Sequence, residues 1–369
     1  MAKYLGLLLV FVLTGCLNGQ VKTAANGIAF SADFLTSAQA ELLYEKAKAF
    51  PNHTELSLAL LENEKIRFVG IKRLNDTLRV TENHQHVFEI GSISKVFTST
   101  LLAEFALDET LRLSDAIQDY VSFPIGTPEK ITFQSLANHT SGLPRLPSNL
   151  HLLFVDRDNP YKGYDSAKLI TYLTEKIALE QAPETKYAYS NLGAGLLGYV
   201  LAELRDTTYE NLLQEKIFKP YGMYTSSTQM ETLNAPIVRG LNPNGEVTSN
   251  WDFNVLAGGG AILSTTEDLA KFASAQFDKD NAALLLTQRP TFKVSEYMEV
   301  GLGWHILHRK NGRTLLWHNG GTGGYTSSMA LDPDAKRGVI ILSNVSAFNP
   351  DMKQIDPLCF ALIDTLAEN

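Results

Sequence analysis

Ser92-Ile93-Ser94-Lys95 is the first of three short motifs whose residue types could together activate a serine, and it opens an apolar run with a helical pattern. In a helix, Lys95 lies one turn after Ser92 on the same side, and an amine in apolar surroundings loses proton affinity. Such a lysine can take the serine's proton, while the helix N-terminus favours a developing oxyanion. About one Ser-x-x-Lys is expected by chance in a chain this long, so the motif needs support from others.

The second motif is Tyr189-Ser190-Asn191, which precedes a glycine-rich stretch at residues 192–198. A phenol beside an amine and a serine can relay a proton, and an amide can hold a substrate carbonyl. The glycines let the backbone approach another element closely. The same spacing recurs at Tyr209 and Asn211, but on a charged amphipathic helix, so we expect Tyr209 to pack and Asn211 to be solvated.

The third motif is His318-Asn319-Gly320-Gly321, at the end of a predicted strand. Glycines at a strand end let a substrate lie along the strand edge and let a backbone N–H point at an oxyanion. Taken alone, this stretch would be interpreted as a glycine-rich turn with a stray histidine. Together with the other two motifs it becomes a candidate substrate-binding strand.

The partners and cofactors that the sequence implies are few. The net charge of −8, without a basic stripe, argues against nucleic acid. His84 and His86 could share one face of a strand, but no third ligand is evident, and residues 320–324 are not followed by the Gly-Lys-Ser/Thr of a phosphate loop. We therefore expect no metal and no cofactor, a small-molecule or peptide substrate, and a monomer.

The elements that must position these motifs show strand patterns at both chain ends and helical patterns between them. Residues 55–80 are typical of two or three strands with a turn at Asn75-Asp76, and two hairpins follow Gly301, the first turning at Asn311-Gly312. The second hairpin turns at residues 332–334. Helices are predicted over 36–50, 96–107, 167–177, 195–204, 209–218, 266–275 and 355–366. This order predicts an α/β (α+β) fold, in which an antiparallel sheet formed from both ends carries an inserted helical subdomain.

The N-terminus has the features of an export signal. After Lys3, residues 4–13 are almost wholly apolar, too short for a helix that spans a bilayer of about 30 Å. The stretch ends in Leu13-Thr14-Gly15-Cys16, which resembles the site read by lipoprotein signal peptidase. We expect 1–15 to be a lipoprotein signal peptide, Cys16 to be lipidated, and 16–29 to be a polar tether. The alternative is a plain signal peptide that is cut elsewhere and discards Cys16.

Either signal predicts an exported protein of the bacterial periplasm or cell envelope, held at a membrane if Cys16 carries lipid. Residues 30–369 then form one catalytic domain, with sheet parts at about 30–88 and 300–369 and the helical subdomain at about 89–299. The chain has 369 residues, 44% of them hydrophobic, which is ample for a large core. Cys359 lies in an apolar run and is predicted to be buried in that core.

Taken together, the motifs resemble those of the serine β-lactamase and penicillin-binding protein superfamily, in the branch of class C β-lactamases and DD-peptidases. Ser-x-x-Lys is a signature of such enzymes, and this branch has Tyr-x-Asn where others have Ser-Asp-Asn. The likeness runs in order through roughly 55–345. Its segments are 88–98, 111–121, 136–143, 189–200, 217–223, 258–272 and 317–325. The resemblance implies a β-lactamase/transpeptidase-like fold.

The resemblance also implies a role for each motif. Ser92 would be the acylated nucleophile, Lys95 and Tyr189 would share the proton transfers, and Asn191 would bind the substrate amide. The backbone N–H groups of Ser92 and Gly321 would form the oxyanion hole.

In the third motif, His318 and Asn319 would face the substrate carboxylate, beside Gly320. Most β-lactamases have Lys-Thr-Gly there, and a histidine near its midpoint at neutral pH holds a carboxylate more weakly than a lysine does.

We therefore expect an exported serine hydrolase that cleaves amide bonds of β-lactams or of D-alanyl peptide ends, as a β-lactamase or DD-carboxypeptidase does. Two alternatives stay open. One is a carboxylesterase or D-amino-acid amidase or aminopeptidase with the same active site. The other is a non-catalytic lipoprotein that binds wall peptide, which would have no need of the Ser92 and Lys95 pair.

Overall fold

The computed structural model describes residues 34–150, 156 and 158–366. The predicted signal peptide, Cys16 and the tether therefore lie outside the described residues. Within those ranges, no helix is both long enough and apolar enough to cross a membrane.

In the described part of the chain, one antiparallel sheet of nine strands organises the fold, in the order β3-β2-β1-β11-β10-β9-β8-β7-β6. Strand β11 pairs with residues 56–62 of β1, so the N-terminal and C-terminal parts of the sheet meet at this pair. The strands are β1 (Glu55–Glu62), β2 (Lys65–Leu74), β3 (Thr77–Thr81), β6 (Phe292–Lys293), β7 (Met298–Val300), β8 (His305–His308), β9 (Thr314–Gly321), β10 (Thr326–Asp332) and β11 (Arg337–Ser343). The predicted sheet is confirmed, and its second part begins slightly earlier than expected, at β6.

The predicted hairpins are confirmed at their turns. Asn75 between β2 and β3 has φ +53°, and Gly312 between β8 and β9 has φ +83°. Tight hairpin turns need such left-handed residues, which asparagine and glycine adopt most easily. The turn at 332–336 joins β10 to β11 in the same way, with Lys336 at φ +51°.

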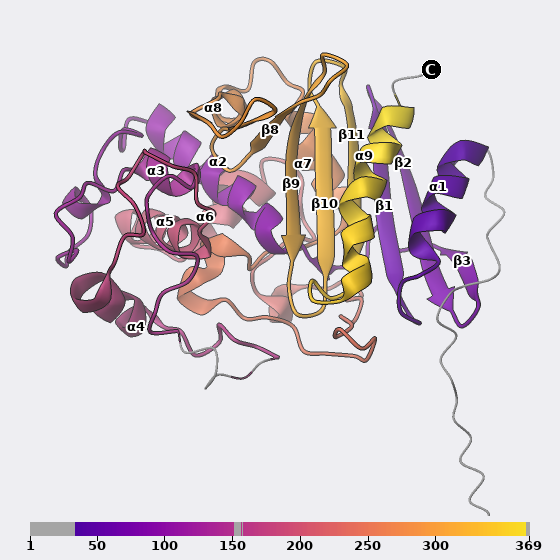
Figure 1. The fold of residues 1–369 in the computed structure, drawn as a ribbon, viewed down its shortest axis with the longest axis horizontal. Helices are drawn as coiled ribbons and strands as arrows, with labels where there is room; N and C mark the ends of the chain where they lie inside the picture. Colours follow the sequence, from indigo (N-terminus) through magenta and orange to yellow (C-terminus); the bar gives the residue numbers. More distant parts are fainter. Residues whose placement is uncertain (1–33, 151–155, 157, 367–369) are drawn as a thin grey trace, which may run out of the picture.

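Two terminal helices cover one face of the sheet, α1 (Ser37–Ala47) and α9 (Ile355–Thr365), as Figure 1 shows. Thr36 caps α1, since its hydroxyl accepts from the Gln39 N–H while the Gln39 side chain accepts from the Thr36 N–H. Cys359 of α9 is fully buried in the apolar cluster between these helices and the sheet, as predicted.

The inserted helical layer covers the opposite face (Figure 1). It contains α2 (Ser94–Leu107), α3 (Phe133–Ala137), α4 (Ser166–Thr171), α5 (Asn191–Leu204), α6 (Tyr209–Leu213), α7 (Thr266–Ala275) and α8 (Ala282–Gln288). The helices predicted over 167–177 and 209–218 both end in a π-helical turn. Helices α3 and α8 were not predicted, because five and seven residues are too few to display a helical period.

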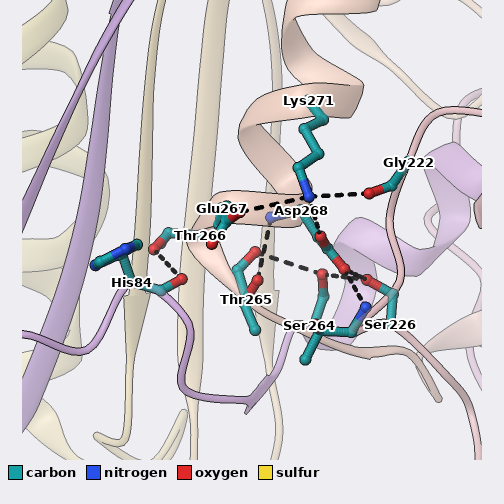
Figure 2. A network of polar contacts seen from close by, with 10 residues as sticks. His84, Gly222, Ser226, Ser264, Thr265, Thr266, Glu267, Asp268 and Lys271 are labelled. Atoms are coloured by element: carbon teal, nitrogen blue, oxygen red, sulfur yellow. Dashed lines mark hydrogen bonds and ion pairs between the residues drawn. The ribbon is translucent and has the colours of Figure 1, made fainter. Parts of the chain in front are cut away.

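A polar network fixes the start of α7 against the sheet (Figure 2). Thr265 caps the helix by accepting from the Asp268 N–H. The Asp268 carboxylate, only 2% exposed, accepts from the Ser226 hydroxyl and pairs with Lys271 at 2.9 Å. The Thr266 hydroxyl meets the Ser57 hydroxyl of β1 at 2.7 Å. The Ser226 hydroxyl also lies 2.8 Å from the Ser264 hydroxyl of β5 (Leu263–Ser264). The partner of β5 is β4 (Phe88–Glu89), which ends three residues before Ser92.

Candidate active site

Ser92 lies in a 3₁₀ turn (Gly91–Ile93) between β4 and α2, pressed against the end of β9. Gly91 has φ +52°, which turns the chain out of β4. A Cβ on Gly320 would lie 2.0 Å from the Ile90 oxygen and 2.9 Å from the Ser92 nitrogen, so only glycine lets β9 come this close. A Cβ on Gly91 would lie 2.6 Å from the Gly321 nitrogen. The backbone nitrogens of Ser92 and Gly321 thus lie near each other, as an oxyanion hole requires.

Lys95 is buried in the first turn of α2, with a side chain that is 1% exposed. Its Nζ lies 3.0 Å from Ser92 Oγ, 2.9 Å from Asn191 Oδ1 and 2.6 Å from the Gly259 oxygen. Among the described residues no carboxylate pairs with it. Burial, and then the charge of Arg145, hold the pKa of Lys95 well below its usual value.

All three contact atoms can accept a hydrogen bond from Lys95 Nζ, and a neutral amine uses two of them. The Asn191 Oδ1 and Gly259 oxygens can only accept, so they take the two hydrogens of a neutral amine. The lone pair then faces Ser92 Oγ and can receive the proton of its hydroxyl. The arrangement is that of a general base beside a nucleophile.

Tyr189 lies beside this pair, with its ring centroid 4.8 Å from Lys95 Nζ. Burial raises the pKa of the phenol, and the neighbouring Ser92 side chain offsets only part of that rise. The imidazole of His139 lies 4.4 Å from the ring, between centroids, and the guanidinium of Arg145 lies 5.1 Å from the ring centre. A protonated phenol in this position can donate to a departing group.

Local sequence explains how Tyr189 and Asn191 are positioned. Ser190 caps α5, since its hydroxyl accepts from the Gly193 N–H at 2.8 Å. The Ser190 N–H donates to His139 Nδ1 at 3.2 Å, and the Asn191 N–H donates to the Arg145 oxygen at 3.0 Å. The loop that contains His139 and Arg145 therefore clamps the motif from the other side.

The glycines of α5 let a second segment reach Lys95. A Cβ on Gly198 would lie 2.9 Å from Gly258 Cα, so the two backbones touch. The next residue, Gly259, presents its oxygen to Lys95 Nζ. The predicted close approach of this glycine-rich stretch is confirmed. Tyr209 packs as expected, at 2.7 Å from the Thr98 hydroxyl.

His318 points toward the site from β9 but lies behind it, with 1% of its surface exposed. Its Nδ1 is 2.6 Å from the Asn319 oxygen, which can only accept, so Nδ1 carries the proton. Its Nε2 has no partner among the described residues. Burial lowers the pKa of His318 well below its usual value, and nearby His305 adds to this. The ring is therefore neutral, and it lies 6.4 Å from the ring of Tyr189.

The expectation that Asn319 faces the substrate is wrong for its side chain. Asn319 Nδ2 donates to the Asp356 carboxylate of α9 at 2.8 Å, on the opposite face of the sheet. Successive side chains of a strand point to opposite faces, so His318 and Asn319 cannot both face the cleft.

Two polar residues near the site, Tyr187 and His305, were not predicted from the sequence. His305 of β8 lies 5.2 Å from the His318 ring, and its Nε2 is 2.9 Å from the Tyr187 hydroxyl. Burial lowers the pKa of His305 to about 4. Burial also lowers the pKa of His139 well below its usual value. His139, His305 and His318 are thus neutral imidazoles that lie around Tyr187 and Tyr189. Within the described part of the chain, no group of histidine, cysteine or acidic side chains is arranged to hold a metal.

A cleft of about 660 Å³ opens over Ser92, Asn191 and Gly321. An aromatic wall borders it, formed by Tyr161, Trp251 and Phe348, with 5.4 Å between the ring centroids of Tyr161 and Trp251. Its remaining lining residues are Arg145, Leu146, Asp158, Pro160, Asn242, Pro243, Thr248, Gly323 and Ala347. Ser92 therefore faces a cavity large enough for a small peptide or a bicyclic ligand.

Comparison with known proteins agrees with this geometry. The family model described as Beta-lactamase matches residues 47–360. D-alanyl-D-alanine-carboxypeptidase/endopeptidase AmpH of Escherichia coli (strain K12) is 28% identical, over 78% of this chain and 79% of that protein. A Beta-lactamase of Pseudomonas fluorescens is 26% identical, over 78% of this chain and 88% of that protein.

Solved structures share the fold at lower identity. A beta-lactamase/D-alanine carboxypeptidase from Pseudomonas syringae aligns with a TM-score of 0.70 at 20% identity, over 89% of this chain and 99% of that one. A class C beta-lactamase aligns with a TM-score of 0.73 at 20% identity, over 92% of this chain and 100% of that one. With the family model matching most of its length, the chain belongs to the beta-lactamase family of serine hydrolases.

Proposed function

We propose that this protein forms an acyl-enzyme on Ser92 and hydrolyses amide bonds at D-alanyl peptide ends and in β-lactams. The observation that carries the proposal is the buried Lys95, whose pKa is lowered by burial and whose Nζ lies 3.0 Å from Ser92 Oγ. A binding protein gains nothing from such a base, because burying an amine without an ion pair costs stability. Two relatives, a D-alanyl-D-alanine-carboxypeptidase/endopeptidase and a beta-lactamase, favour this substrate class.

Acylation follows from the contacts around Ser92. Its Oγ attacks the carbonyl carbon while its proton passes to Lys95 Nζ, 3.0 Å away. The carbonyl oxygen becomes an oxyanion that accepts from the N–H groups of Ser92 and Gly321. Asn191 Oδ1 accepts from Lys95, so its Nδ2 is the end that can donate to the acyl amide of the substrate.

The leaving nitrogen needs a proton when its bond to the carbonyl carbon breaks. Tyr189 donates its phenolic proton and regains one from the Lys95 ammonium, 4.8 Å from its ring centre. Water then attacks the ester on Ser92, gives a proton to the same pair, and releases the acid with the serine hydroxyl restored. Both half-reactions return Lys95 to its neutral form.

Export and membrane attachment belong to the same proposal. An apolar stretch followed by Leu13-Thr14-Gly15-Cys16 supports a lipid anchor on Cys16 and a place in the cell envelope. Fractionation of cells that express the natural chain and its Cys16→Ser variant tests this. Lipidation predicts that only the natural chain sediments with membranes and incorporates labelled fatty acid.

Intact mass against time with benzylpenicillin tests the acyl-enzyme. A mass increase equal to one penicillin is expected on the natural chain and on a Ser295→Ala control, whose serine is exposed and distant in sequence, but not on Ser92→Ala. Free penicillin is assayed in parallel, so a lasting adduct identifies a DD-peptidase type and loss of penicillin identifies a β-lactamase type. No adduct and no loss of penicillin would contradict the proposal and leave the esterase or amidase alternative.

A further inference from the structure

In most β-lactamases the strand that corresponds to β9 supplies a lysine for the substrate carboxylate, but β9 supplies no cation here. His318 holds that position in β9, but its ring is buried, uncharged and in contact with Tyr189 and His305 rather than with the cleft. Asn319 faces α9. A carboxylate that enters the cleft must therefore find its partner on another element.

Arg145 is the one cation among the described residues that line the cleft. Its side chain is exposed, and it forms no ion pair with any residue in the described ranges. Its position is nevertheless defined, because its backbone oxygen accepts from the N–H groups of Asn191 and Leu192. The guanidinium stacks 5.1 Å from the ring centre of Tyr189, which itself borders Lys95.

The positions of Tyr189 and Lys95 also indicate which part of the substrate, the leaving group, would reach Arg145. The departing atom must receive its proton from Tyr189 or Lys95, so the leaving group lies on the Tyr189 side of Ser92. Arg145 lies against the same phenol ring. A planar guanidinium presents paired N–H donors that match a carboxylate.

We infer that Arg145 binds a carboxylate on the leaving group and so selects substrates whose leaving portion is an acid. The inference rests on the proposed acyl-transfer function. In the reaction, the bond from the acyl carbon to the leaving nitrogen or oxygen breaks, and Ser92 Oγ takes its place. The Ser92 proton reaches the leaving atom through Lys95 and Tyr189, and the carboxylate stays ionised throughout, so only the proton moves.

Two matched esters test the inference. Phenylacetylglycine is esterified with 3-hydroxybenzoate in one and with 3-hydroxybenzamide in the other, so the leaving groups differ chiefly by one negative charge. The quantity measured is the ratio of kcat/KM for the anionic ester to that for the neutral ester. Any effect of Arg145 on Lys95 acts on both esters and cancels in this ratio.

Arg145→Gln should lower the ratio about 10- to 100-fold, the value of one charge-assisted pair. Arg145→Lys should keep most of it, and Arg112→Ala, which removes an arginine that is 86% exposed, should keep all of it. A ratio that stays within about twofold of the natural value in Arg145→Gln, with the variant folded by circular dichroism, would overturn the inference.

A binding measurement separates this inference from the proposed function. Calorimetry gives the dissociation constants of 3-hydroxybenzoate and 3-hydroxybenzamide without any turnover. If Arg145→Gln weakens the binding of the acid but not of the amide, the role of Arg145 is supported even if neither ester is hydrolysed. The lack of hydrolysis would then refute only the acyl-transfer proposal. Equal loss for both compounds, or no loss, would refute the role of Arg145.

Discussion

Glu89 makes the stability of this fold depend on pH in an unusual direction. It is the last residue of β4, three positions before Ser92, and its carboxyl is 4% exposed. One oxygen accepts from Asn250 Nδ2 and from the Trp251 N–H, each at 2.7 Å. The other oxygen has no hydrogen-bond partner among the described residues, although Thr322 lies nearby.

Burial raises the pKa of Glu89 from 4.5 to about 7, because an ionised carboxylate is poorly solvated there. The folded state therefore holds this proton more tightly than the unfolded state does. The stabilisation from the proton is complete below pH 4.5 and is lost as the pH rises toward 7. At 1.36 kcal/mol for each pKa unit, the loss between pH 5 and pH 8 is roughly 2 to 3 kcal/mol.

The Glu89→Gln variant should remove this dependence, because an amide keeps the acceptor oxygen and cannot ionise. Urea unfolding of both proteins at pH 5 and pH 8 gives the free energy of unfolding of each. We expect the variant to gain roughly 2 to 3 kcal/mol relative to the natural protein between those pH values. Glu64→Gln, at an exposed turn, serves as the matched control.

Comparing the two proteins at each pH cancels the contributions of all other titrating groups. One of these is the set of buried histidines, whose lowered pKa values destabilise the fold in acid. A difference between natural protein and Glu89→Gln that stays constant from pH 5 to pH 8 would refute the reasoning. It would mean that Glu89 is ionised in the folded protein across this range.

Two further changes test the site and its support. Lys95→Met removes the proposed base while keeping a side chain of similar length. Acylation by an activated ester, measured by stopped-flow absorbance, should therefore slow about 10²- to 10⁴-fold. An unchanged rate would mean that another group takes the Ser92 proton. Asp268→Ala leaves the Thr225 N–H and the Ser226 hydroxyl without their acceptor, and should lower the free energy of unfolding by roughly 2 to 3 kcal/mol in urea. Glu267→Ala, next in the same helix and more exposed, should change it by less than about 0.5 kcal/mol, and equal losses in the two variants would argue against the buried network.

Most of the fold follows from short-range patterns in the sequence. Asn75 and Gly312 mark hairpins because few other residues adopt positive φ cheaply. Ser92 and Lys95 can be predicted as a pair because a helix places side chains that are one turn apart on the same side. The prediction that the side chains of His318 and Asn319 both face the substrate is wrong. The two-residue period of a strand excludes it, because successive side chains point to opposite faces of the sheet.

Other parts of the site depend on contacts between distant segments. Nothing in the loop around Arg145 distinguishes it from an ordinary surface cation. Its place against Tyr189 arises because its backbone oxygen caps two N–H groups at the start of α5, nearly fifty positions later in the chain. The pairing of His305 with Tyr187 likewise joins β8 to the segment before α5. Such residues carry no local signal, and only the assembled fold reveals them.

The distribution of charge around Ser92 follows from the need to keep Lys95 neutral. A buried cation at position 318 would have to lose its water near Lys95, which has no carboxylate partner among the described residues, and this is costly. Arg145 instead supplies the positive group for a substrate carboxylate from the exposed rim of the cleft. Water solvates its guanidinium there until a carboxylate binds. Its charge also lowers the pKa of Lys95 and so helps to keep the base ready. A neutral imidazole on β9 and a guanidinium on the loop are therefore two parts of one arrangement, in which the cation proposed to bind the substrate also lowers the pKa of the proposed base.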